Sequence, residues 1–204
     1  MTTKTHWDST YKQCGSANVS WFRPHLDLSL GLIRHAAASS QAAIIDVGGG
    51  ASTLVDDLLA AQYHDVTVLD ISAAALAVAK QRLGAAASPV TWLDGDITQM
   101  DLPAGRYDVW HDRAVFHFLT SPADRERYVA TVKRALRPGG HVIMATFASD
   151  GPEKCSGLPV ARFDAGSLHA QFGGQFELLD SRREMHLTPI GKEQHFVYCF
   201  CRLR

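Results

Sequence analysis

The stretch AAIIDVGGGASTLVDDLL, residues 42–59, decides the fold of this chain. An apolar run reaches Asp46, three glycines follow at 48–50, and leucines then return at helical spacing. The pattern predicts a buried strand over 42–47, a tight turn, and a helix over 52–62. Glycine loses more backbone freedom on folding than other residues, so three in a row indicate that something comes close to the main chain.

Strand and helix patterns alternate along the chain. Up to residue 148 this alternation is typical of parallel strands joined by right-handed crossovers, with helices on both faces. Beyond it, two strands joined by a Pro-Gly turn predict an antiparallel hairpin. We therefore expect an α/β fold, a three-layer, doubly wound, Rossmann-like sheet that is mostly parallel with an antiparallel C-terminal strand. The predicted strands cover 42–47, 65–72, 89–96, a stretch from 107, 141–148, 175–189 and 194–204, and the predicted helices cover 52–62, 72–84, 121–140 and 163–173.

Composition argues against several classes of protein. The chain has 204 residues, a net charge of −1 and a pI of about 6.8, so no basic excess points to a nucleic-acid partner. No apolar run approaches the roughly 18 residues that cross a bilayer, and the N-terminus lacks the apolar core of a secretory signal. We therefore expect a cytoplasmic protein without a membrane partner.

The cysteines do not form a disulfide framework at this length. Cys14, Cys155, Cys199 and Cys201 are expected to be free, buried or half-buried thiols. Cys199 and Cys201 are two residues apart, so in a strand they share a face. C-x-x-C spacing is absent, and no metal site is predicted.

The acids around the glycine turn indicate the charge of a ligand. Ligands of doubly wound sheets bind outside the carboxyl ends of the strands, where Asp70 ends the second predicted strand and suits the hydroxyls of a ribose. A dinucleotide favours a third glycine, but Ala-Ser-Thr follows Gly50, and Ser52 of that triplet is available to cap the helix. Asp46 disfavours a pyrophosphate and favours a cationic ligand. S-adenosylmethionine (SAM), with its sulfonium and ammonium, is therefore preferred over NAD.

At these motifs the sequence resembles the class I SAM-dependent methyltransferases. The D-x-G-x-G turn of that family matches DVGGG at 46–50, and its L-x-P-G-G matches LRPGG at 136–140. The family's adenine-side acid falls on Asp94 or Asp96 in LDGDI, and the order and spacing of the family are kept over 42–148.

The resemblance implies a seven-stranded methyltransferase fold, SAM as cofactor and S-adenosylhomocysteine as its product. Plainer interpretations remain open: Asp70 could cap the following helix, and the acids of LDGD could make a tight turn without a ligand. The residues expected to bind the cofactor are Asp46, Gly48, Gly49, Gly50, Ser52, Asp70, Ile71, Asp94, Gly95, Asp96, Ile97 and His111, together with Trp7, Tyr11 and Trp21.

The segment before the first strand is similar to that of a subgroup that includes lysine methyltransferases of elongation factor 1A. The similarity rests on Trp7-Asp8 with Tyr11 and on VSWF at 19–22. It implies that Trp7, Tyr11 and Trp21 close over the cofactor, where a ring face attracts a cation; the alternative is that they only anchor the segment to the core. We expect one methyltransferase domain over 1–204, composed of a lid or packing segment at 1–40, a cofactor-binding core at 42–148, and an acceptor-side loop, helix and hairpin at 149–204.

The end of the fourth strand, WHDRAVFHFL, supplies the catalytic candidates because it abuts the methyl group in this fold. His111 or His117 could take a proton, Asp112 could hold the SAM ammonium or the acceptor, and Arg113 could bind an anionic substrate or pair with Asp112. A structural Asp112–Arg113 pair with packing histidines is the alternative. The protein-lysine enzymes of the subgroup end this strand near LDKGT, so Arg113 departs from their pattern and weakens the transfer of lysine specificity.

The acceptor is the least determined part of the prediction. The loop over 150–164 is a second candidate wall, with Cys155 as a thiol that could contact a soft acceptor and Arg162 beside it. We expect a small-molecule acceptor, whether an amine, a thiol or a metalloid anion. The alternatives are a protein-lysine methyltransferase, an NAD-binding oxidoreductase, and a SAM-binding module without catalysis.

Overall fold

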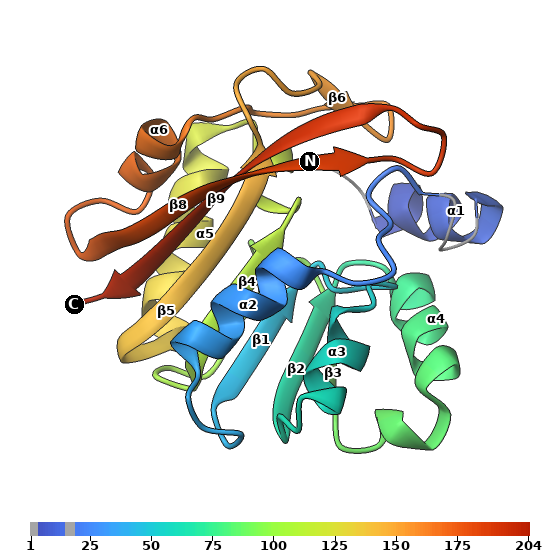
Figure 1. Ribbon diagram of the computed structural model, residues 1–204, viewed down its shortest axis with the longest axis horizontal. Helices are drawn as coiled ribbons and strands as arrows, with labels where there is room; N and C mark the ends of the chain where they lie inside the picture. The colour runs from blue at the N-terminus through green and yellow to red at the C-terminus, as the bar shows by residue number, and fades with distance from the viewer. Residues whose placement is uncertain (1–3, 15–18) are drawn as a thin grey trace.

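The strands build one mostly parallel sheet (Figure 1). The computed structural model describes residues 4–14 and 19–204. The strands of the sheet are β1 (Ala43–Val47), β2 (Asp65–Asp70), β3 (Thr91–Asp94), β4 (Tyr107–Arg113), β5 (Leu136–Phe147), β8 (Phe176–Leu187) and β9 (Glu193–Leu203). Their order is β3-β2-β1-β4-β5-β9-β8, with β1 to β5 parallel and β9 antiparallel to both β5 and β8. The predicted α/β fold with an antiparallel C-terminal strand is confirmed.

Helices cover both faces of the sheet (Figure 1). They are α1 (Lys4–Cys14), α2 (Asp27–Ala36), α3 (Leu54–Ala60), α4 (Ala73–Leu83), α5 (Pro122–Ala135) and α6 (Ala165–Ala170), with 3₁₀ turns at Gly84–Ala87 and Phe116–Phe118. One core lies under α2, α3 and α4, and the other under α5 and α6. Successive residues of β1, Ile44 and Ile45, are fully buried in opposite cores, as strand alternation requires. No helix of the described ranges is long and apolar enough to cross a membrane.

Local signals place the helix ends. The Ser72 hydroxyl accepts a hydrogen bond from the Ala75 amide at 3.1 Å and caps α4, which stops at Gly84 with φ +56°. Pro122 occupies the first turn of α5, where its missing N–H is tolerated. The cysteines on β9, Cys199 and Cys201, are both buried in the same core, as their spacing predicts; the side chain of Cys14 lies outside the described part of the chain.

Two segments differ from the sequence prediction. The Pro-Gly-Gly turn expected after the helix belongs to β5, whose first residue Leu136 pairs with Tyr107 next to an irregular step in β4. Pro138 cannot donate a helical hydrogen bond and disfavours helix in the residue before it, so α5 ends at Ala135. The expected loop at 150–164 contains a short antiparallel ladder, β6 (Lys154–Cys155) with β7 (Leu158–Pro159).

Candidate cofactor and acceptor site

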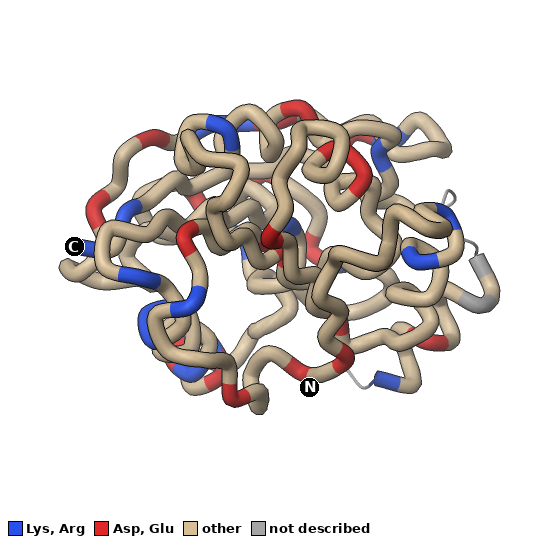
Figure 2. The backbone as a smooth tube through the Cα atoms, turned by 90° about the horizontal axis from the view of Figure 1, so that it is seen from below, with Lys and Arg blue, Asp and Glu red and all other residues tan. Residues whose placement is uncertain are grey.

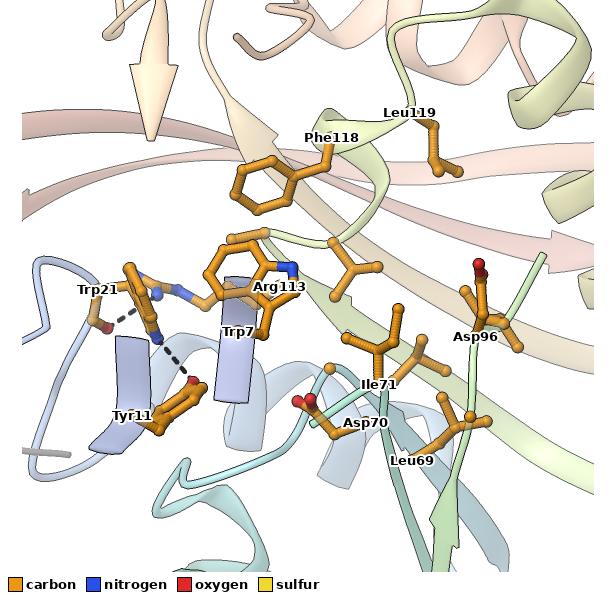
Figure 3. A pocket seen from close by; sticks show the side chains of 16 residues that line it. Trp7, Tyr11, Trp21, Leu69, Asp70, Ile71, Asp96, Arg113, Phe118 and Leu119 are labelled. Atoms are coloured by element: carbon orange, nitrogen blue, oxygen red, sulfur yellow. Dashed lines mark hydrogen bonds between the residues drawn. The ribbon is translucent and has the colours of Figure 1, made fainter. Parts of the chain in front are cut away.

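A cavity opens at the carboxyl ends of the central strands (Figure 3). Its empty volume, part of which is open to solvent, is about 750 Å³. We call it the main cavity. Its walls are formed by the ends of β1 to β4, and Trp7 and Tyr11 of α1 also line it. The predicted site residues that line it are Trp7, Tyr11, Trp21, Gly48, Asp70, Ile71, Gly95, Asp96, Ile97 and Arg113.

The glycine turn forms part of the cavity wall and tolerates no side chain. Gly48 and Gly50 have φ of +72° and +30°, in the region that favours glycine. A Cβ on Gly48 would lie 2.0 Å from Cγ2 of Val115, and one on Gly50 would lie 2.5 Å from Oδ2 of Asp70. The Gly48 and Gly49 amides donate to the carbonyl of Leu69 at 2.7 and 3.2 Å, which ties the turn to β2.

Asp70 is a buried carboxylate that borders the cavity at the end of β2 (Figure 3). It is 7% exposed, and its Oδ1 accepts the Ser72 amide at 2.7 Å. Burial raises the pKa of Asp70 to about 7, the Ser72 amide opposes this, and the negative charges of Asp46, Asp94 and Asp8 add to it. Asp70 therefore contacts the start of α4 and also faces the cavity, so its position does not decide between the two sequence interpretations. Further hydrogen-bond donors in the cavity would stabilise its charged form.

The two acids at the end of β3 have different surroundings. Both carboxylate oxygens of Asp94 lie 2.5 Å from Nζ of Lys4 on α1, and Asp94 is outside the cavity lining. Asp96 lines the cavity, and its Oδ1 accepts the amide and the hydroxyl of Thr98 at 2.9 and 2.7 Å. Of the two acids that the sequence left open, the structure places Asp96 in the cavity and Asp94 in an ion pair with Lys4 of α1.

Aromatic side chains form the roof. Trp7 and Tyr11 come from α1, and Trp21 follows it; the indole N–H of Trp21 donates to the Tyr11 hydroxyl at 3.3 Å. The ring of Trp7 meets Trp21 and Phe118 edge-on, with centroids 5.8 and 5.0 Å apart. Burial raises the pKa of Tyr11, with Asp70 as a further cause, so this hydroxyl stays protonated. We call Trp7, Tyr11, Trp21 and Phe118 the aromatic roof.

The helix α1 is also held by polar contacts to α4 and to β3. Asp8 of α1 accepts the Ser72 hydroxyl at 2.6 Å and the Ala74 amide at 3.3 Å. Together with the Lys4–Asp94 pair, this fixes α1 to the start of α4 and to the end of β3. An acid at these amides also suits the N-terminal end of α4.

A second cavity adjoins the first around the glycine turn. Its empty volume is about 490 Å³, and it shares Tyr11, Trp21, Gly48 and Arg113 with the main cavity. We call it the side cavity. The other predicted site residues that line it are Asp46, Gly49, Ser52 and His111. The Ser52 hydroxyl accepts the Leu54 amide at 3.2 Å at the start of α3.

His111 is fixed on both ring nitrogens. Its Nδ1 lies 2.7 Å from Oδ1 of Asp46, and its Nε2 lies 2.9 Å from the hydroxyl of Ser29 on α2. All three side chains are buried. His111 therefore borders the side cavity with both nitrogens already engaged, which does not suit a base that takes a proton from an acceptor.

Arg113 pairs with the C-terminal hairpin rather than with Asp112. Its guanidinium lies 3.1 Å from Oε2 of Glu184 on β8 and donates through Nε to the hydroxyl of Tyr198 on β9 at 3.1 Å. Arg23 contacts the other oxygen of Glu184 at 2.6 Å. One carboxylate thus neutralises part of the charge of two arginines that both line the side cavity. The predicted Asp112–Arg113 pair is replaced by this cluster.

Asp112 and His117 point away from both cavities. Asp112 accepts hydrogen bonds from the Val115 and Phe116 amides and from the Tyr128 hydroxyl inside the core, and burial raises its pKa to about 6. His117 is fully buried, and burial lowers its pKa to about 3. Neither side chain lines a cavity, so the structure does not bring them to the acceptor position for which they were proposed.

The segment after β5 does not deliver its thiol to the cavity. Cys155 is buried and packs in the core under α2 and α3, and burial raises its pKa to about 12. Arg162 pairs with Glu153 at 3.0 Å within its own segment. Neither side chain lines either cavity.

Sequence reasoning missed several residues of the site. Ser29, Glu184 and Tyr198 carry no local motif and reach the site only through the fold. Arg23 was detectable, because it directly follows the aromatic pair Trp21-Phe22 that the resemblance singled out.

Comparison with known proteins agrees with this geometry. Residues 44–140 match a family described as "Methyltransferase domain". The chain is 24% identical over 149 residues to the mouse "eEF1A lysine and N-terminal methyltransferase", a match that covers 70% of this chain and 21% of that protein. This chain thus spans about a fifth of that relative's length.

Solved structures share the whole fold. A SAM-dependent methyltransferase from Anabaena variabilis superposes with a TM-score of 0.78 at 16% identity, covering 100% of this chain and 96% of the other. Burkholderia thailandensis 1,6-didemethyltoxoflavin-N1-methyltransferase, solved with its acceptor and S-adenosylhomocysteine, gives 0.73 at 21% identity, covering 98% and 86%. Fold, motifs and sequence matches together support the predicted class I SAM-dependent methyltransferase. Its methyltransferase domain lies at 44–140, and the predicted cofactor SAM is supported.

Proposed function

We propose that this methyltransferase binds SAM across the main and side cavities and methylates a small-molecule acceptor. The observation that carries the choice of cofactor is the backbone of the glycine turn. The Gly48 and Gly49 amides, which a pyrophosphate would need as donors, are bonded to Leu69. The surrounding side chains add the carboxylates of Asp46 and Asp70. Amides that are already hydrogen-bonded and lie next to carboxylates suit a cationic nucleoside and disfavour a dinucleotide.

Each part of the site has a chemical role in this proposal. Asp70 accepts the ribose hydroxyls, and Asp96 with Ile71 and Ile97 forms the adenine end of the cavity. Asp46 in the side cavity faces the amino-acid end, and the aromatic roof attracts positive charge. Bound SAM supplies an electrophilic methyl group on a sulfur that leaves as a neutral thioether.

The chain acts mainly by positioning and by excluding water. Among the described residues lining the main cavity beside Phe118 are Trp7 and Val115, which are apolar, and Arg113, which is already paired. Of the histidines among the described residues, only His111 lines either cavity, and both of its ring nitrogens are already engaged. The acceptor therefore brings its own nucleophile, such as a neutral amine or a thiolate, and the roof removes water from it.

The residues around Phe118 in the main cavity favour a small molecule over a lysine side chain as the acceptor. A lysine ammonium needs a free acid beside it, whereas Arg113 lines this part of the cavity, and the two acids that line the main cavity, Asp70 and Asp96, are assigned to the cofactor. Basic and acidic residues are interspersed along the backbone in Figure 2, and the net charge of −1 gives no basic excess that would favour nucleic acid.

A protein-lysine acceptor is the second candidate. It is favoured by the N-terminal Trp7–Tyr11–Trp21 cluster, whose sequence pattern suggested the subgroup, and by the similarity to the mouse relative, which is named for eEF1A.

Isothermal titration with SAM and NAD, followed by transfer of labelled methyl from SAM, tests the proposal. We expect SAM to bind, NAD not to bind, and label to enter a metabolite extract rather than a protein extract. Asp70→Ala should weaken the binding of SAM by more than about tenfold, because the ribose hydroxyls lose a charge-assisted hydrogen-bond partner. Label confined to protein would establish the second candidate, and binding of NAD without SAM would refute both.

A further inference from the structure

Three buried side chains form a hydrogen-bonded series beside the side cavity. Ser29 on α2 lies 2.9 Å from Nε2 of His111 on β4, and Nδ1 of His111 lies 2.7 Å from Oδ1 of Asp46 on β1. Their exposures are 0%, 1% and 3%. The residue types are those of a hydrolase triad, but Ser29 lines neither cavity, so its hydroxyl cannot reach a substrate. The series can hold a group in place but cannot attack one.

The direction of the hydrogen bonds is fixed at the Asp46 end. A carboxylate only accepts, so Nδ1 of His111 carries a proton and donates to Asp46. In the neutral ring Nε2 accepts the Ser29 hydroxyl, and in the charged ring it donates to that oxygen. Tyr198, whose hydroxyl is 3.5 Å from Ser29, gives the serine a second partner. In both states His111 fixes the carboxylate of Asp46 in one orientation.

The second oxygen of Asp46 lacks a donor. Oδ2 is buried and has no hydrogen-bond partner among the described residues. A Cβ on Gly49 would lie 2.5 Å from Oδ2, which places that oxygen directly under the glycine turn. A buried, unpaired carboxylate oxygen is unfavourable, and an ammonium group is the donor that suits it best. The site therefore calls for a cationic group at the side-cavity end of the ligand.

We propose that His111, held by Ser29, is a positioning residue that fixes Asp46 for the α-ammonium of the cofactor. The inference rests on the proposed function, because it requires the amino-acid end of SAM to enter the side cavity. It separates His111 from the chemical step: the histidine acts on recognition of the cofactor through Asp46.

Two adenine nucleosides isolate this role. S-adenosylhomocysteine and 5′-methylthioadenosine both carry a neutral thioether, and only the first has the amino-acid end. Isothermal titration of each nucleoside should show that His111→Leu weakens the binding of S-adenosylhomocysteine by about tenfold and the binding of 5′-methylthioadenosine by less than about twofold. Ser29→Ala should show the same selectivity with a smaller loss. His111→Asn, whose amide N–H can donate to Asp46, should recover most of the affinity.

The control is His141→Leu, on β5 and outside both cavities, which should change neither affinity. Equal losses for both ligands, or no loss for S-adenosylhomocysteine, would overturn the inference. So would a wild-type protein that binds both ligands equally tightly. If thermal unfolding shows that His111→Leu does not fold, Ser29→Ala decides: it must weaken S-adenosylhomocysteine selectively. A wild-type protein that binds neither nucleoside would instead contradict the proposed function.

Discussion

Replacing Asp70 by asparagine should stabilise the cofactor-free protein and weaken the binding of SAM. Burial raises the pKa of Asp70 from 3.8 to about 7. Between those pH values the folded protein keeps a proton on this carboxyl that the unfolded chain has released. The folded state thus binds more protons, and its free energy of unfolding falls as the pH rises through that range.

The magnitude follows from the same interval. At about 1.36 kcal/mol per pH unit, the span from 3.8 to about 7 corresponds to about 4 kcal/mol of stability lost by about pH 8. Asparagine has nearly the same shape and no charge, so Asp70→Asn should recover up to about 4 kcal/mol at about pH 8 and less than half of it at about pH 5. Asp112, whose pKa is also raised, titrates in both proteins and cancels in the difference.

Urea unfolding of both proteins without cofactor, at the two pH values, measures this difference. Asp94→Asn is the matched control, since its ion pair with Lys4 is at the surface and should contribute less than about 1 kcal/mol. A gain of the same size at both pH values, or a loss at the higher one, would refute the assignment of a buried charge at Asp70. The affinity for SAM should fall in the same variant, because the amide nitrogen of asparagine cannot accept a ribose hydroxyl.

Two further substitutions test the packing of the site. Gly48→Ala should lower the thermal midpoint more than Gly173→Ala: both glycines have similar positive φ, +72° and +69°, but only at Gly48 would the new Cβ meet a neighbour, at 2.0 Å. Equal shifts would mean that backbone strain alone matters. Arg113→Lys should cost about 2–3 kcal/mol in denaturant unfolding, because lysine cannot bridge Glu184 and the Tyr198 hydroxyl, whereas Arg162→Lys at an exposed pair should cost less than about 1 kcal/mol. Similar costs for the two arginines would contradict this reading of the buried cluster.

Local chemistry made much of the fold predictable. The glycines after Asp46, the cap at Ser72 and the proline at 122 act on their immediate neighbours, so the pattern of residues is enough to place a turn or a helix end. The alternation of buried strands and amphipathic helices then leaves few arrangements of the sheet, and the observed order is one of them.

The site was less predictable because its partners are distant in sequence. Asp94 is paired because Lys4 reaches it, and Arg113 is oriented by its ion pair with Glu184. In both pairs the two residues are far apart along the chain. The alternation of side chains along a strand was a usable signal that the resemblance at the end of β4 outweighed. Adjacent residues of β4 point to opposite faces of the sheet, so His111 and Asp112 could not both face the cofactor.

The aromatic roof has a practical consequence. Trp7 and Trp21 line the cavity, whereas Trp110 is fully buried in the core. Indole emission depends on polarity and on nearby charge, so entry of a sulfonium beneath these rings should quench or shift the protein's own fluorescence. The chain thus contains its own optical reporter of occupancy, and cofactor exchange can be followed in real time without a label.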